Sequence, residues 1–217
     1  MSGVTEPPSE PLPGLGRGRF IVFEGGEACG KSTQSRLLAD DLDAVLSHEP
    51  GGTPIGARLR ELLLDPATIG LEPRAEALLM AADRAQHLSE VVRPALDAGR
   101  HVVADRSAFS SMAYQGYGRG LPLAEVRHLS DWATEGVWPD LVVLLEVSVA
   151  TAAERLDSTL DRMEQLGDEF HRRVADGFRA MAAADPDRWV VIDGGRPVDE
   201  VAASVRAAVR ERLQLLG

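Results

Sequence analysis

Short apolar runs alternate along the chain with longer stretches whose apolar residues recur every three or four positions. Runs rich in Val, Ile, Leu and Phe indicate buried strands, whereas the longer period indicates helices. Strands that alternate with helices favour an α/β fold, in which a parallel sheet has helices on both faces. The predicted strands are Phe20 to Glu24, Ala44 to Ser47, His101 to Ala104, Leu141 to Val147 and Trp189 to Ile192.

The same pattern predicts helices and a domain boundary. From Ser32 to Leu46 the apolar residues are spaced for a helix, and this range overlaps the second predicted strand. Pro73 to Gly99 is expected to form one long helix. Residues 1–18 are rich in Pro, Gly and Ser and are expected to form an unpacked tail. Residues 19–217 contain no linker or repeat, so we expect a single domain.

Composition excludes several classes of partner. The chain has 217 residues, is 44% hydrophobic and carries a net charge of −11, which argues against a nucleic-acid or anionic-membrane surface. Its one cysteine excludes an internal disulfide, and no apolar stretch is long enough for a membrane span or signal peptide. We therefore expect a cytoplasmic protein that uses its arginines to bind small anionic ligands.

The strongest chemical signal is the spacing G-x-x-x-x-G-K-[ST] from Gly25 to Ser32. It follows a predicted strand and opens a predicted helix, where backbone N–H groups bind phosphates. Lys31 is the only lysine of the chain, and its ammonium can follow a moving phosphate better than a planar guanidinium. Lys31 is expected to reach the β- and γ-phosphates, and the Ser32 hydroxyl to bind Mg²⁺. The predicted ATP-binding residues are Gly25, Gly26, Glu27, Ala28, Cys29, Gly30, Lys31, Ser32 and Thr33.

Two further candidate segments follow predicted strands, where ligands of such sheets bind. The turn at residues 48–54 can aim Glu49 toward the crevice. Taken alone it is better explained as a surface turn, but its position at the carboxyl end of a strand favours a role in the site. After the third strand, Asp105 can organise a metal site and Arg106 can bind a phosphate bidentately. A structural ion pair between Asp105 and Arg106 is the alternative.

A charged stretch from Glu154 to Glu164 follows the fourth strand and has weak packing signals. A mobile lid can bring cations to a transferring phosphoryl group while excluding water. We expect such a lid at about residues 153–168. A solvated helix face is the other interpretation.

The chain contains five informative segments in this order: Phe20 to Thr33, Glu49 to Thr53, Ala81 to His87, Asp105-Arg106 and Ala113 to Gly120. Together they resemble bacterial thymidylate kinases, which belong to the P-loop nucleoside monophosphate kinases. The resemblance implies a three-layer P-loop NTPase fold with a parallel five-stranded sheet, helices on both faces and a mobile lid. It implies transfer of the γ-phosphoryl group of Mg·ATP to dTMP, giving dTDP and ADP for dTTP biosynthesis, by a homodimer packed through helices beside the sheet.

The resemblance also implies roles for individual residues. Arg60 and Arg106 are expected on the acceptor phosphate, with Arg84 near the base; Ser111 and Gln115 are expected to contact thymine. Tyr114 is expected to pack under the deoxyribose, and Glu27 to line the acceptor side. The implied acceptor-binding residues are Glu49, Arg60, Met80, Arg84, Arg106, Ser111, Tyr114 and Gln115.

The implied catalytic residues include a lid arginine. The family places its catalytic arginine in the phosphate loop or in the lid, and this loop has no cation besides Lys31. Arg162 fits best by its spacing to Phe170-His171, and Arg155 is the other candidate. The implied catalytic residues are Lys31, Arg162, Arg155, Asp105 and Glu27, and the implied metal-binding residues are Ser32 and Asp105.

Three acceptor-side positions depart from the family: Met80 stands where Phe is usual, His48 where Arg is usual, and Ser107 where an aromatic residue is usual. A thioether packs on a ring edge but offers no π face. A same-fold kinase for another pyrimidine nucleoside monophosphate is therefore one alternative. A degenerate nucleotide-binding module is another, because the lid stretch between Arg155 and Arg162 is shorter than is usual in the family and lacks a middle basic residue. Cys29 stands where a small residue is usual; it either packs as one or acts as an oxidisable thiol.

Overall fold

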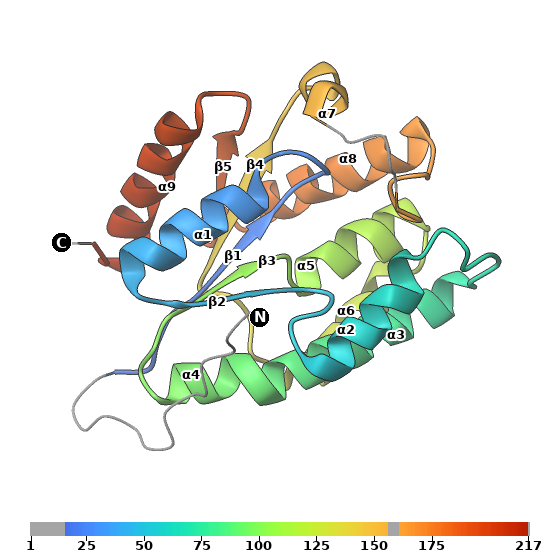
Figure 1. Cartoon of the computed structure of the whole chain (residues 1–217), viewed down its shortest axis with the longest axis horizontal. Coiled ribbons are helices and arrows are strands. Elements are labelled where there is room, and N and C mark those ends of the chain that lie inside the picture. The colour runs from blue at the N-terminus through green and yellow to red at the C-terminus, as the bar shows by residue number, and fades with distance from the viewer. Residues whose placement is uncertain (1–15, 156–160, 217) are drawn as a thin grey trace.

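The computed structural model describes residues 16–155 and 161–216 and consists of a five-stranded sheet between two layers of helices (Figure 1). Every strand pair is parallel, in the order β2-β3-β1-β4-β5. The predicted α/β fold and all five predicted strands are confirmed, with bounds that differ by at most one residue. The strands are β1 Phe20–Glu24, β2 Val45–His48, β3 Val102–Asp105, β4 Leu141–Glu146 and β5 Trp189–Asp193.

Helical segments cover both faces of the sheet (Figure 1). The α-helices are α1 Lys31–Leu42, α2 Pro54–Leu64, α3 Pro73–His87, α4 Arg93–Asp97, α5 Ala108–Ser111, α6 Leu123–Thr134, α7 Val149–Arg155, α8 Asp168–Ala184 and α9 Val198–Leu213. Two π-helical segments are η1 Leu88–Val92 and η2 Met112–Gly118. No helix within the described ranges is long and apolar enough to span a membrane.

The central strands are buried on both faces, which is why they read as continuous apolar runs. Along β1, Phe20 and Val22 pack with residues of α8 and η1, whereas Ile21 and Phe23 pack with residues of α1 and α9. This alternation follows from the two-residue repeat of a strand. It produces two hydrophobic cores, one on each side of the sheet.

Two expectations about helices had different outcomes. The helix predicted from Ser32 to Leu46 ends at Leu42 instead, because Asp43 adopts a left-handed conformation with φ 47°. Val45 and Leu46 then pair with β3, so the strand prediction was the correct one for them. The long helix predicted from Pro73 to Gly99 is confirmed as a continuous helical path through α3, η1 and α4.

Most of the predicted tail lies outside the described residues, but its last residue is packed. Gly18 is buried, and its N–H donates to Leu96 O at 2.9 Å. A Cβ at this position would lie 1.9 Å from Arg100 O, so the chain passes here only because Gly18 has no side chain. The prediction of an unpacked tail is therefore wrong at Gly18.

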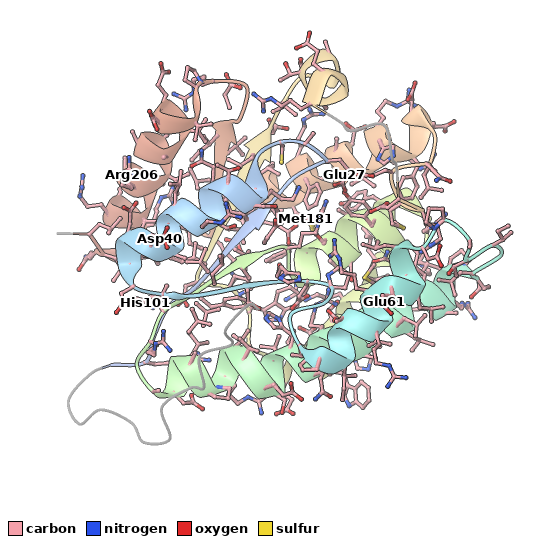
Figure 2. All side chains as sticks on the ribbon, viewed as in Figure 1. Glu27, Asp40, Glu61, His101, Met181 and Arg206 are labelled. Carbon is pink, nitrogen blue, oxygen red and sulfur yellow. The ribbon has the colours of Figure 1, made fainter. Side chains whose placement is uncertain are left out.

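Parallel strands end at a common edge of the sheet, and the loops that follow them carry the chemistry. Figure 2 shows Glu27, which follows β1, at this edge, whereas His101, which precedes β3, lies at the opposite edge. The segments after β1, β2 and β3 therefore face one cleft.

Candidate active site

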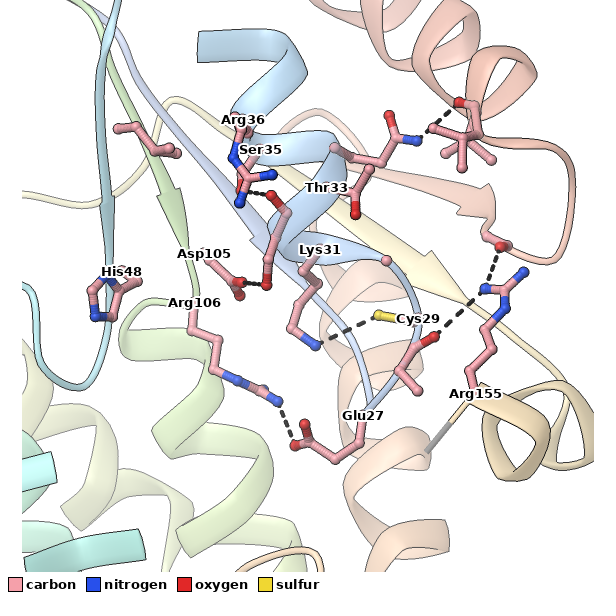
Figure 3. Close-up of a pocket in the computed structure, with 18 of the residues that line it drawn as sticks. Glu27, Cys29, Lys31, Thr33, Ser35, Arg36, His48, Asp105, Arg106 and Arg155 are labelled. Carbon is pink, nitrogen blue, oxygen red and sulfur yellow. Dashed lines mark hydrogen bonds and ion pairs between the residues drawn. The ribbon is translucent and has the colours of Figure 1, made fainter. Parts of the chain in front are cut away.

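The phosphate-binding loop joins β1 to α1 and requires its first glycine. Gly25 has φ +141°, and a Cβ there would lie 2.4 Å from Leu145 O. The Lys31 side chain folds back into the loop, where Nζ donates to Gly26 O at 2.6 Å and lies 3.6 Å from Cys29 Sγ (Figure 3). Because only 6% of Lys31 is exposed, its ammonium is held at the place where the loop would bind phosphates.

Ser32 and Asp105, the two residues expected to bind a metal ion, meet across the cleft. Ser32 Oγ donates to Asp105 Oδ2 at 2.6 Å (Figure 3). These are hard oxygen ligands, and Mg²⁺ in kinases is commonly held by one or two such groups together with substrate phosphates. The described residues contain no group of three or more His, Cys, Asp or Glu side chains that could hold a metal alone. The donor set therefore fits a magnesium ion that is shared with a nucleotide.

Arg106 joins the phosphate loop to the helices that follow β3. Its backbone has φ +75°, a strained conformation for a residue with a side chain. Its guanidinium pairs with Glu27 and lies 5.0 Å from the centre of the Tyr114 ring, and Tyr114 Oη donates to Glu27 at 2.7 Å. Burial alone would raise the pKa of Glu27, but Arg106 and Lys31 hold it at about 2. Glu27 is therefore ionised at neutral pH.

Glu24 lies fully buried at the end of β1, beneath the loop. Its carboxylate accepts hydrogen bonds from Ser107 Oγ at 2.7 Å and Ser110 Oγ at 2.6 Å. Ser107, which replaces an aromatic residue, thus serves as a hydrogen-bond donor and also caps α5. Burial raises the pKa of Glu24 to about 7, although Ser110 and Arg106 oppose the shift.

Glu24→Gln is expected to flatten the pH dependence of stability. Because the folded-state pKa is about 7 against 4.5 for a free side chain, Glu24 stabilises the fold fully below pH 4.5 and loses this effect as the pH rises through 7. The loss amounts to about 3 kcal/mol. The free energy of unfolding by urea should therefore differ less between pH 4.5 and pH 7 in the variant than in the unaltered protein. The exposed Glu125→Gln is the control, and equal changes in all three proteins would contradict the assignment.

A second cavity opens beside the loop, between α2, α3 and η2. All eight residues predicted to bind the acceptor line it together. They are Glu49, Arg60, Met80, Arg84, Arg106, Ser111, Tyr114 and Gln115. Glu27, Glu49, Arg60 and Arg106 also line the loop cleft of about 770 Å³. The two sites therefore share a wall.

A buried hydrogen-bond network holds the base of this cavity. Glu49 accepts from Arg84 Nε and pairs with His87 Nδ1, both at 2.9 Å, and His87 Nε2 lies 2.7 Å from Ser47 Oγ. Arg84 Nη2 in turn donates to Ser111 Oγ at 3.1 Å. Burial alone would raise the pKa of Glu49, but Arg84 and His87 hold it below its usual value. The network fixes Arg84 relative to Ser111 in the cavity wall.

Removing the imidazole from this network should destabilise the fold. His87 is completely buried, so His87→Ala leaves a cavity, and Ser47 and Glu49 lose a partner. We expect a loss of about 2–4 kcal/mol in the free energy of unfolding by urea. The exposed His128→Ala should change it by less than about 0.5 kcal/mol. Equal stabilities would contradict the structural role of the network.

Comparison with known proteins agrees with this arrangement. A family model described as thymidylate kinase matches residues 23–205. The thymidylate kinase of Clavibacter michiganensis subsp. michiganensis (strain NCPPB 382) is 48% identical over 197 residues, which cover 87% of this chain and 93% of that protein. The chain belongs to the thymidylate kinase family. The thymidylate kinase of Deinococcus radiodurans is 46% identical over 205 residues, covering 91% and 99%. The crystal structure of thymidylate kinase from Ehrlichia chaffeensis has a TM-score of 0.72 at 32% identity and covers 89% and 99%.

In this thymidylate kinase family member, the two candidate lid arginines lie in different places. Arg155, at the end of α7, donates to Gly194 O at 3.0 Å and to Ala28 O of the phosphate loop at 3.5 Å (Figure 3). Arg162 instead binds Glu76 Oε2 and Leu63 O, both at 2.7 Å. The better candidate by sequence spacing thus lies at the acceptor cavity, and the second candidate lies at the loop.

The predicted lid region includes residues 156–160, which lie outside the described residues. After this gap, the chain packs against the core, although the sequence gave only weak packing signals. Met163 is only 4% exposed, joins the core beside α8 and lines the acceptor cavity together with Asp161. The signal available in the sequence was the spacing of Leu156, Leu160 and Met163, which recur at intervals of four and three residues.

Sequence reasoning gave no role to several charged residues that this thymidylate kinase fold buries. Glu76 is completely buried although it lies on a helix where charges are normally solvated. Its position on the same helical face as Met80 and Arg84, at intervals of four residues, was the available signal. Glu24 and His87 likewise lie within the segments that resemble the family, but the sequence indicated no function for them.

Proposed function

We propose that this protein transfers the γ-phosphoryl group of Mg·ATP to dTMP, giving dTDP and ADP. The observation that carries the proposal is the wall shared by the two cavities, which includes Glu27, Arg60 and Arg106. One cavity holds a complete phosphate-binding loop, and the other gathers every residue that the family resemblance assigns to the acceptor. A donor and an acceptor nucleotide would therefore meet at these side chains. Family membership supports the same reaction.

The proposed mechanism relies on positioning and charge neutralisation. The acceptor is a phosphate, which is already a nucleophile, so a general base adds little. Lys31 would follow the γ-phosphate, while Arg60 and Arg106 hold the acceptor phosphate in line with it. Mg²⁺, when bound near Ser32 and Asp105, would neutralise charge on the donor phosphates.

We propose Arg155 as the arginine that neutralises the transferring group. Its guanidinium lies at the phosphate loop, with part of its hydrogen-bonding capacity used by the carbonyls of Ala28 and Gly194. Arg162 is held by a fully buried carboxylate at the acceptor cavity. For Arg162 we propose a structural role in closing that cavity.

The acceptor is the part of the proposal that most needs a test. Turnover by the purified protein should be measured over dTMP, dUMP, dCMP, dGMP and dAMP with Mg·ATP as donor. We expect the highest kcat/KM for dTMP. Preference for another pyrimidine nucleotide would favour an altered acceptor specificity, for which Met80, His48 and Ser107 are the candidate causes. If dTMP never raises ADP production, the protein is a nucleotide-binding module without transferase activity.

Met80→Phe tests whether the thioether limits acceptor affinity. Met80 lines the acceptor cavity on α3, where an aromatic ring could stack on the base. Stacking contributes about 1–3 kcal/mol per base, so the variant should lower the KM for dTMP at least about fivefold with little change in kcat. Steady-state kinetics measure this, with Leu79→Phe on the same helix as control. An unchanged or higher KM would show that Met80 does not limit the affinity for dTMP.

We further propose a cytoplasmic homodimer. Exposed apolar side chains occur on three helices that lie beside one another, α2, α3 and α6: Ile55 on α2, Leu78 on α3 and Trp132 on α6, which is 77% exposed. Such side chains often mark an interface. Light scattering should give twice the chain mass of 23.3 kDa, and a monomeric mass would refute the dimer.

A further inference from the structure

Glu76 of α3 lies next to the acceptor cavity and is saturated with hydrogen bonds. Its Oε1 accepts from Gln115 Nε2 at 2.9 Å and from Arg119 Nε at 3.2 Å. Its Oε2 accepts from Arg119 Nη2 at 2.8 Å and from Arg162 Nη2 at 2.7 Å. The side chain is completely buried. Four donors around one carboxylate leave no room for a proton on either oxygen.

Glu76 is therefore ionised. Burial alone would raise its pKa, but the hydrogen bonds from Arg119, Gln115 and Arg162 hold the pKa below its usual value. An ionised carboxylate can only accept hydrogen bonds. Whatever faces Glu76 must donate.

This charge fixes the orientation of the Gln115 side-chain amide. The oxygen and nitrogen of an amide have nearly the same shape, so packing alone does not choose between the two orientations. Because Glu76 accepts only, Gln115 must direct Nε2 toward it. Oε1 is then directed away from Glu76. No described residue donates a hydrogen bond to this oxygen, and Gln34 Oε1 is the one fully enclosed side-chain polar atom without a partner in the described ranges. Gln115 Oε1 is thus accessible in the cavity that Gln115 lines.

We propose that Glu76 is a positioning residue: it holds Gln115 with Oε1 toward the acceptor, so that the site selects bases that carry N–H at position 3. Thymine and uracil have this N–H, whereas N3 of cytosine is an acceptor and would face another acceptor. A buried polar group left without a partner is strongly rejected. The inference rests on the proposed function, since the base of the acceptor must lie in this cavity.

The lid region contributes to this selection. Arg162 lies within the predicted lid region and Arg119 follows η2, so two guanidinium groups from different parts of the chain neutralise Glu76. Either one alone would keep the carboxylate ionised. Removing Arg119 should therefore weaken the fold and leave base selection in place. This difference separates the orienting role from simple structural support.

Glu76→Gln provides the direct test. A neutral amide at this position can donate or accept, so Gln115 is free to turn. The kcat/KM for dTMP relative to dCMP should fall by about tenfold or more, the effect of one unpaired buried group. The ratio for dTMP relative to dUMP should stay within about twofold, because both bases carry the same N3–H. Arg119→Gln should keep both ratios. An unchanged dTMP-to-dCMP ratio in Glu76→Gln overturns the inference.

Two further measurements keep the test decisive. If Glu76→Gln does not fold, Gln115→Leu removes the amide itself and should lower the dTMP-to-dCMP ratio in the same way, again with little effect on dTMP relative to dUMP. A retained dTMP-to-dCMP ratio in Gln115→Leu overturns the inference. The unaltered protein is assayed alongside, and failure to phosphorylate dTMP there refutes the proposed function instead.

Discussion

Lys31→Arg is expected to keep the positive charge of the phosphate loop and lose most phosphoryl transfer. Lys31 Nζ sits within the loop, 2.6 Å from Gly26 O, and only 6% of the residue is exposed. A planar guanidinium is too wide for this position and cannot follow the γ-phosphate as it moves. We expect kcat to fall by about 10²- to 10³-fold, the usual effect of losing one donor to the transition state.

Single-turnover kinetics with saturating ATP and dTMP measure this loss. Lys31→Met is the matched comparison, because it has a similar length and no charge. Similar losses in both variants would show that geometry as well as charge is required at this position. Near-normal turnover in Lys31→Arg would contradict the argument and make the unique lysine a matter of composition alone.

Arg155→Ala should also lower kcat strongly. Its guanidinium lies at the phosphate loop, and arginines that neutralise a transferring phosphoryl group contribute about 10³-fold or more to kcat. We expect a loss of this order in kcat, with a small change in the KM for dTMP. Steady-state kinetics with both substrates varied separate the two parameters.

Arg162→Ala and Arg127→Ala complete this experiment. Arg162 is bound to Glu76 at the acceptor cavity, so its loss should raise the KM for dTMP and lower stability more than it lowers kcat. Arg127 is half exposed on α6, where it pairs with Asp131 and lies over the Trp138 ring. Its loss should therefore change neither kcat nor KM. A larger drop in kcat for Arg162→Ala than for Arg155→Ala would reverse the roles proposed for them.

The fold and the phosphate loop were predictable because their signals are local. Each strand is an uninterrupted apolar run, and the spacing of Gly25, Gly30 and Lys31 is complete within eight residues. The rule that parallel strands end at one edge also placed Asp105 on the same side of the sheet as the phosphate loop. The eight acceptor-binding residues were predicted only from the family resemblance, and all of them line one cavity.

The buried charge networks were not predictable, because they join distant residues. Glu76 meets Arg162 across 86 positions of sequence, and Ser47 meets His87 across 40. In the sequence, each of these polar residues would be expected to face solvent. Only the tertiary structure supplies the partners that allow them to be buried. The packing of Gly18 against Arg100 was not predictable either, because it requires the absence of a side chain, and this leaves no pattern in the sequence.

The burial of a unique lysine in the phosphate loop has a chemical consequence for the whole protein. Enzymes and metabolites that acylate lysine remove its positive charge. In most proteins such reactions are spread over many surface lysines. Here they have one side-chain target, Lys31, whose ammonium is enclosed by Gly26 and Cys29. The loop therefore protects the protein from random acylation, and any lysine acylation that does occur modifies the phosphate-binding group itself.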